Sequence, residues 1–401
     1  MTALDVLLRR PAPARDAPAF PRIDRLGALL ALVGAVALVL LPFVDFKANR
    51  ILPGDPHGLA QVLPTWAALG CEAMFAAVAV AALLASNALL RLTAALAGIV
   101  IIAAALAAAA DALTPLHNHI VRVAPGAGFW LLLVALGLLA ADAIARLHPG
   151  PGIRVLLLAL FLGIAGLSLA HGTFDRVSIM REYAVNASAF ALAARQHVGL
   201  SLGSLAAAFI VALPLGIFCH RAPRLQPGIL SALNLIQTIP SIALFGILMA
   251  PLGALAAHVP LAAELGIRGI GAAPAVLALF LYSLLPLVAN TVAGLKRVSP
   301  ATVEAAHGMG MTRWQTLLSV ELILALPVIL TGVRIVLVQN IGLVAVAALI
   351  GGGGFGTFIF EGIGQNAIDL VLLGAIPTVV LAFSAGVLLD ALVEVLDQAS
   401  P

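Results

Sequence analysis

Residues 299–327 read SPATVEAAHGMGMTRWQTLLSVELILALP, a polar interruption in a chain that is otherwise almost continuously apolar. Ser299 followed by Pro300 predicts a helix start, because serine caps free N–H groups and proline suits the first helical position. Gly308 and Gly310 predict that this helix ends there, since glycine disfavours a helix interior. The stretch therefore begins with one short helix.

A second short helix is predicted directly after the glycines. Thr312 and Gln315 have the spacing of a capping box, in which each side chain bonds to the backbone N–H of the other residue. Met309, Met311 and Trp314 place apolar side chains among these polar residues. Two helices joined by a glycine hinge indicate a docking surface, and an amphipathic loop without a partner is the alternative.

Outside this stretch the chain has the composition of a membrane protein. It is 62% hydrophobic and 10% charged, with a mean hydropathy of +1.14. Soluble domains have an apolar share nearer one half, and runs of about 20 apolar residues are long enough to cross a bilayer. The alternating pattern of a membrane β-barrel is absent. We therefore expect an all-α, polytopic membrane protein.

The apolar runs predict about ten transmembrane helices. These lie near residues 26–44, 66–85, 92–113, 128–145, 153–170, 198–219, 229–250, 274–295, 323–347 and 370–393. Between the first two, prolines and glycines predict a non-helical loop over 45–63.

The distribution of lysine and arginine predicts the orientation, because these residues accumulate in cytoplasmic loops. With the N-terminus inside, the inner segments contain 13 of the 21 basic residues and the outer segments contain 7. The remaining one, Arg334, lies inside a predicted helix, where it either faces the bundle interior or snorkels to the surface. The bias predicts N-in and C-in, with the 299–327 stretch in the cytoplasm.

Composition divides the chain into four parts. We expect a cytoplasmic arm at 1–25, an N-terminal block of about five transmembrane helices at 26–175, an outer segment with room for an interfacial helix at 176–197, and a second block at 198–394 with a cytoplasmic loop at 299–320. Intramembrane polar residues, prolines and glycines concentrate in the second block.

One string in the second block, QTIPSIALF at residues 237–245, combines polar residues with a helix-breaking proline. Pro240 removes a backbone hydrogen bond and disfavours helical geometry in its predecessor. Such polar groups in a membrane helix either join helices or line a path. The candidates for a translocation path are Asn234, Gln237, Thr238, Pro240, Ser241, and, in the next helix, Ser283 and Asn290.

A glycine run lies in the predicted outer loop at 351–366. It lacks the lysine of a phosphate-binding loop. Gly353, Gly354 and Phe355 are candidates for an outer gate or for docking of a binding protein, and a flexible connector is the alternative.

Part of the 299–327 stretch resembles a known motif. Glu304-Ala305-Ala306, then Gly310 and later Pro327, is similar to the EAA loop of ABC-importer permeases, although Ile323 stands where many relatives have a first proline. In that family the loop is the coupling helix that contacts the cytoplasmic ATPase. The resemblance implies that Glu304, Ala305, Ala306, Gly310 and Trp314 couple this chain to such an ATPase.

Four strings resemble the osmoprotectant branch of these permeases, which serves glycine betaine, choline and related amines. They are LNLIQTIPS at 233–241, GMGMTRWQ at 308–315, ALPLGI at 212–217 and GGGGFG at 351–356. The resemblance covers about half of the chain, and it implies a C-terminal permease core in a bacterial inner membrane. Its implied partners are cytoplasmic ABC ATPase subunits, an extracytoplasmic substrate-binding protein, a second permease copy and membrane lipid.

Nothing in the sequence indicates an enzyme, a cofactor or a nucleic-acid site. Catalytic motifs are missing, and Cys71 and Cys219 have no metal-type spacing. We expect no cofactor in this chain, with ATP and magnesium bound by the partner ATPase. The alternatives are an ABC permease for another solute such as an amino acid, or a secondary transporter using Glu72, Asp111 or Asp142.

Overall fold

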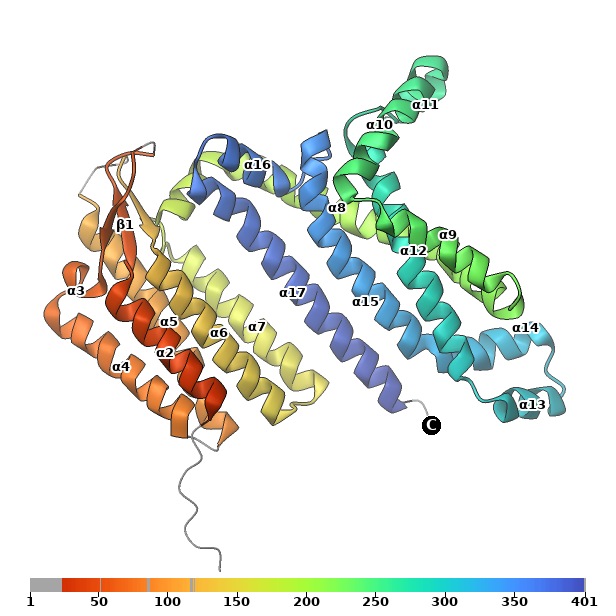
Figure 1. Cartoon of the computed structure of the whole chain (residues 1–401), viewed down its shortest axis with the longest axis horizontal. Coiled ribbons are helices and arrows are strands. Elements are labelled where there is room, and N and C mark those ends of the chain that lie inside the picture. Colours follow the sequence, from red (N-terminus) through yellow and green to blue (C-terminus); the bar gives the residue numbers. More distant parts are fainter. Residues whose placement is uncertain (1–23, 51, 85–86, 116–117, 119, 400–401) are drawn as a thin grey trace, which may run out of the picture. The chain divides into compact units, whose positions relative to one another are not determined.

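The computed structural model describes residues 24–399 apart from 51, 85–86, 116–117 and 119, so nearly all of the predicted arm at 1–25 lies outside the described residues. The described chain is mainly helical and forms two compact units (Figure 1). The first unit consists of the chain up to Phe46, Asp55–Leu113 and Pro125–His148. The second consists of Lys47–Gly54, Thr114–Ala124 and the chain from Pro149 onward.

The first unit is built on four apolar helices. They are α2 (Arg25–Leu40), α4 (Thr65–Leu84), α5 (Ala88–Leu113) and α6 (Ala127–Leu147), and the loop after α2 contains β1 (Val44–Lys47), β2 (Asp55–His57) and α3 (Leu59–Val62). β1 and β2 pair antiparallel, with Val44 opposite His57 and Phe46 opposite Asp55. The loop predicted at 45–63 therefore contains a short hairpin. The prediction that it is non-helical is wrong at α3, whose start is capped by the Gln61 side chain accepting from the Gly58 N–H at 2.9 Å.

Charged side chains meet at one end of the first unit. Arg91 is fully buried; its Nη1 lies 2.5 Å from Asp24 and 3.4 Å from Asp142, and its Nη2 donates to the Ala82 carbonyl at 3.0 Å. Arg146 pairs with both carboxylates. Burial raises the pKa of Asp24, but hydrogen bonds from Arg91, a backbone N–H and Arg146 outweigh burial and hold that pKa well below its usual range. Asp142, a candidate for ion coupling, is thus held in a salt-bridge cluster.

The second unit contains the remaining elements. They are β3 (Arg122–Pro125), α7 (Pro151–Ala170), α8 (Ser178–Arg221), α9 (Gln226–Thr238), α10 (Ser241–His258), α11 (Pro260–Glu264), α12 (Ala272–Arg297), α13 (Pro300–Gly308), α14 (Arg313–Thr316), the π-turn η1 (Leu317–Glu321), α15 (Leu322–Ala347), the 3₁₀ turn η2 (Ala348–Ile350), α16 (Gly356–Gly364) and α17 (Ile368–Ala399). α7, which the sequence analysis grouped with the N-terminal block, packs against α17 in this unit.

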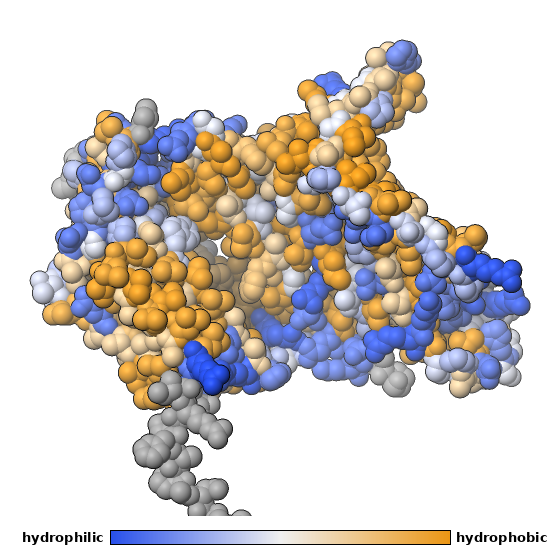
Figure 2. All heavy atoms as spheres, viewed as in Figure 1, coloured by the Kyte–Doolittle hydropathy of each residue, from blue (hydrophilic) through white to orange (hydrophobic). Residues whose placement is uncertain are grey.

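Nine helices in the described part of the chain are long and apolar enough to cross a membrane. The expectation of an all-α, polytopic membrane protein is confirmed. α2, with 16 residues, is a shorter apolar helix. Figure 2 shows apolar side chains over much of the visible surface, while hydrophilic side chains gather around α13 and α14.

The single helix predicted at 229–250 is wrong. The structure divides it into α9 and α10, because Ile239 adopts an extended conformation (φ −71°, ψ 127°) before Pro240. Proline cannot donate the hydrogen bond that would continue α9, and it disfavours helical geometry in the preceding residue. The helix-breaking proline was visible in the sequence, but the prediction of one helix through it did not include the break that it causes.

The segment at 176–197 is helical and continues into the predicted sixth helix as α8. Asn186 interrupts the regular geometry (φ −109°, ψ 16°), and its side-chain amide donates to the Glu182 carbonyl at 2.9 Å. A kink of this kind requires only a local loss of helical bonding, so the element continues beyond it.

The core of the second unit lies where α8, α12 and α15 pack together. Gly216 of α8 faces Thr291, and Gly332 of α15 faces Asn290, so small residues allow close helix approach. The Asn340 amide donates to Ser204 at 3.0 Å and to Ser283 at 3.1 Å, all three being buried. This core supports the two candidate sites described next.

Candidate functional site

The 299–321 segment folds as the sequence predicts locally. The Ser299 hydroxyl accepts from the Thr302 N–H at 3.1 Å and caps α13, which ends at Gly308. Gly310 adopts a positive φ of 86°, which strains other residue types, so the reversal between the helices depends on glycine. Thr312 and Gln315 form the predicted capping box of α14.

This segment exposes large apolar side chains among polar residues, just before and at the start of the apolar stretch Arg313–Ile350. Met309 is 78% and Trp314 is 71% exposed, and Glu304 and Ala305 are also exposed. We call Glu304, Ala305, Met309, Gly310 and Trp314 the coupling surface, after the role that the sequence resemblance implies for this segment. A rigid aromatic side chain left in solvent is typical of a protein interface.

Two residues predicted for this surface differ from their neighbours. Ala306 is only 1% exposed, because it lies on the inward face of α13. Met311, grouped with the apolar docking residues, is half-buried. Ala306 therefore packs within the chain instead of facing a partner.

A cavity of about 260 Å³ opens at the break between α9 and α10. It is lined by Gln237, Thr238, Ile239, Pro240, Ser241, Tyr282, Gln339 and Leu343. The Gln237 amide donates to the Tyr282 carbonyl at 2.7 Å, and the Tyr282 hydroxyl donates to the Ile239 carbonyl at 2.5 Å. The carbonyl of Ile239, which a continuous helix would use, is thus satisfied by a side chain on α12.

The lining combines apolar walls with amide and hydroxyl groups, and it contains no aspartate, glutamate, lysine, arginine or histidine. Such a surface offers hydrogen-bond donors and acceptors without a net charge. It can form hydrogen bonds with a small polar molecule.

Four of the predicted path residues, Gln237, Thr238, Pro240 and Ser241, meet in this cavity, and three do not. Asn234 is exposed and lies outside the lining. Ser283 is fully buried and donates to the Leu279 carbonyl at 2.6 Å, so it serves helix packing.

The third residue outside the cavity, Asn290, donates to the Pro286 carbonyl at 2.8 Å and packs on Gly332. Two polar residues of the lining, Tyr282 and Gln339, are not among the path residues that the sequence predicts. Their polar side chains in apolar helices were visible in the sequence, but their convergence on α9 was not.

The three candidate gate residues lie in a tightly packed junction. Gly353 and Gly354 have φ values of 79° and 82°, and Phe355 is 5% exposed at the start of α16. The Phe355 N–H donates to His197 Nδ1 at 3.2 Å, and the ring centroids of these residues are 5.0 Å apart. The Gly354 N–H donates to Gln196 at 3.2 Å. The described geometry is not that of a loose connector.

Arg334 forms an ion pair within the second unit. Its Nη1 lies 2.5 Å from Asp390 of α17, and Asp390 also accepts from Arg154 of α7 at 2.6 Å. Arg154 pairs with Glu394 as well. The sequence predicted that Arg334 either faces the bundle interior or snorkels to the surface. Neither alternative included its carboxylate partner Asp390, which is 56 residues away in the sequence.

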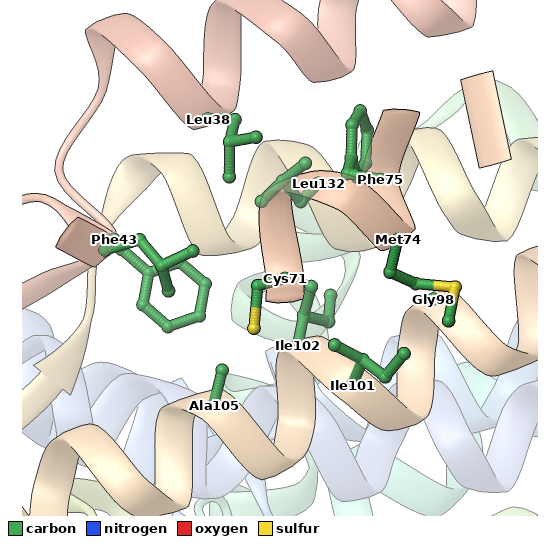
Figure 3. A pocket seen from close by; sticks show the side chains of 11 residues that line it. Leu38, Phe43, Cys71, Met74, Phe75, Gly98, Ile101, Ile102, Ala105 and Leu132 are labelled. Atoms are coloured by element: carbon green, nitrogen blue, oxygen red, sulfur yellow. The ribbon is translucent and has the colours of Figure 1, made fainter. Parts of the chain in front are cut away.

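The first unit contains a different kind of space. Apolar side chains, together with Cys71 and Met74, surround a cavity of only about 10 Å³ (Figure 3). This volume holds about one water-sized probe. The cavity is therefore a packing defect and too small for a solute.

Comparison with known proteins connects both halves to transport. Residues 24–180 match the family described as ABC transporter permease YehY, N-terminal domain, and residues 212–400 match the family described as binding-protein-dependent transport system inner membrane component. The chain is 44% identical over 211 residues to the osmoprotectant import permease protein OsmW of Salmonella typhimurium, covering 53% of this chain and 93% of that protein.

Two further proteins are similar over about half of the chain. The chain is 40% identical to the carnitine transport permease protein OpuCD of Listeria monocytogenes, covering 48% of this chain and 80% of that protein. It is also similar to a chain of the inward-facing MetNI methionine ABC transporter, with a TM-score of 0.46, 20% identity, and coverage of 52% of this chain and 95% of that chain.

Proposed function

Because this chain belongs to the family of binding-protein-dependent transport system inner membrane components, we propose that it is the permease subunit of an ATP-driven importer for osmoprotectants of the glycine betaine, choline or carnitine type. The observation that carries the solute class is the 44% identity to an osmoprotectant import permease across nearly all of that protein. The sequence strings at 233–241 and 308–315 support the same branch.

The coupling surface is the proposed contact with the partner ATPase. Its exposed Trp314 and Met309 are suited to a protein groove, and Gly310 allows the turn that presents them. The excess of lysine and arginine in alternate loops supports an N-in, C-in orientation, which puts this surface in the cytoplasm. ATP and magnesium would be bound by that partner, since this chain lacks a phosphate-binding lysine motif.

The cavity at the α9–α10 break is the proposed solute-contacting part of the path. Its uncharged polar lining suits a small solute that must both enter and leave. A second permease copy would complete the path, and a separate binding protein would deliver the solute from outside. ATP-driven closure of the ATPase would shift the permease between inward-open and outward-open states.

The two alternatives from the sequence gain no supporting observation. A secondary transporter needs an ionisable group free to bind the coupling ion, and Asp142 is occupied by Arg91 and Arg146. An amino-acid importer shares the fold, but the relatives compared above by sequence are named for osmoprotectants and carnitine.

Reconstitution in liposomes tests the proposal. The chain would be co-purified with an ATPase subunit and a binding protein, and ATP-dependent uptake of glycine betaine, choline, carnitine and one amino acid would be compared. We expect uptake of at least one of the three amines and none of the amino acid. ATP-dependent uptake of the amino acid alone would reject the solute class, and uptake without ATP would reject the importer.

A further inference from the structure

The α13–α14 segment is joined to the membrane helices through a π-turn. Residues Leu317–Glu321 form the wide turn η1 between α14 and α15. A π-turn inserts one residue relative to an α-helix and rotates the following side chains around the axis, and such turns are frequent at functional sites. The turn therefore sets the direction in which Glu321 points.

Glu321 points to the end of α8. Its Oε1 lies 2.7 Å from Nη2 of Arg221, although the two residues are 100 positions apart. The Glu321 side chain is 4% exposed and that of Arg221 is 46% exposed. A buried carboxylate that receives a charge-assisted bond is tightly constrained, because its loss would leave the carboxylate unpaired.

Other charged and titratable groups face this pair. His220 lies close enough to Arg221, Glu321 and Lys296 to interact electrostatically with each of them. Lys296 lies in the last turn of α12. Glu321 thus pairs with the end of α8 at the start of α15, and the end of α12 lies beside them, with Lys296 near His220 and Leu295 packed on Leu317.

An apolar cluster lies beside the ion pair between Glu321 and Arg221. Leu317 of the π-turn packs with Leu295 of α12 and with Ala325 and Ile329 of α15. Partly buried residues of α8 complete this cluster, namely Phe209, Leu213 and Ile217. Apolar contacts permit sliding, whereas a hydrogen-bonded ion pair fixes the relative position of two helix ends.

We propose that Glu321 and Arg221 are a positioning pair that makes the coupling surface move as one body with the inner ends of α8 and α12. The pair transmits force from the partner ATPase into the helices next to the cavity. This inference rests on the proposed function, since it requires an ATPase that docks on α13 and α14.

The test uses the full complex in liposomes, with the solute transported by the unaltered protein. Solute uptake and ATP hydrolysis are measured for Glu321→Gln, for the charge exchange Glu321→Arg with Arg221→Glu, and for Glu394→Gln. The last variant removes an ion-pair partner of Arg154 at a site remote in sequence from the π-turn and serves as the matched control.

We expect Glu321→Gln to reduce the solute transported per ATP by about 5- to 150-fold, the usual range for coupling between sites. ATP hydrolysis should remain within about twofold, because the ATPase keeps its own active site and its docking surface. The charge exchange should recover most of the ratio, and Glu394→Gln should leave it unchanged.

Three results would overturn the inference: an unchanged ratio in Glu321→Gln, an equal loss in Glu394→Gln, or no recovery in a charge exchange that accumulates normally. If Glu321→Gln fails to accumulate in the membrane, the charge exchange decides alone, and failure of both would assign the pair to folding only. Failure of the proposed function differs from all of these, because the unaltered complex would then show no ATP-dependent uptake.

Discussion

The two units of this chain both contain internally satisfied polar groups, but they differ in the space and the surfaces that they leave accessible. In the first unit, Asp24, Arg91, Asp142 and Arg146 satisfy one another at one end of the helices, and the cavity beside Cys71 is apolar and very small. In the second unit, a broken helix leaves a polar cavity of about 260 Å³, and Trp314 stands in solvent. Polar groups that are satisfied internally stabilise a fold, whereas polar groups that remain accessible can act on a solute or a partner.

The largest effect is expected at the buried cluster of the first unit. Arg91→Leu removes the cation between two carboxylates and should lower the free energy of unfolding by about 3–5 kcal/mol. Arg146→Leu is the matched control, because its side chain is 43% exposed and its loss should cost much less. Unfolding would be followed in detergent by circular dichroism, and equal losses in the two variants would contradict the cluster's internal role.

Exposed tryptophans provide a direct contrast between the units. Trp314 and Trp66 are 71% and 79% exposed, one in each unit. Trp314→Ala should weaken binding of the partner ATPase by about 2 kcal/mol or more, as for a central interface residue. Trp66→Ala should leave that binding unchanged. The measurement is the affinity of each purified variant for the ATPase, and a loss in Trp66→Ala alone would reverse the assignment.

The cavity lining should show a smaller effect on transport. Gln237→Ala removes one amide group from the cavity lining, and the loss of one hydrogen bond to the solute costs about 1 kcal/mol of binding free energy. Solute concentration at half-maximal uptake should therefore change by about fivefold. Asn234→Ala, on the same helix but outside the cavity, should behave as the unaltered protein does. Indistinguishable profiles for the two variants would remove the cavity from the path.

The smallest expected effect is the change with pH in the stability that Asp24 contributes. Because the pKa of Asp24 is lowered on folding, its contribution to stability is fully present above the unfolded-state pKa of about 4 and is lost only as pH falls through the lower folded-state value. The stability difference between the unaltered protein and Asp24→Asn should hence be constant between pH 5 and 8, about one unit or more above that pKa. Unfolding midpoints measured across this range test it, and a difference that grows toward pH 8 would contradict it.

Local features near the sequence signals were predictable. The caps at Ser299 and Thr312, the turn at Gly310 and the helix interruption near Pro240 each depend on residues within a few positions of one another. Contacts between distant positions were not. The sequence shows that Ser283 and Gln237 are both polar, but only packing shows that Ser283 is buried with Asn340 while Gln237 borders a cavity.

By itself, the sequence determined that the chain crosses a membrane, where most of its apolar helices lie and where two polar helices interrupt them, because hydrophobicity, capping and proline chemistry act over short distances. Tertiary structure alone decided which polar groups face one another: Arg221 with Glu321, Arg334 with Asp390, and Arg91 with Asp24 and Asp142. These pairings depend on the rotation and crossing of packed helices, which the periodicity of any single helix does not contain.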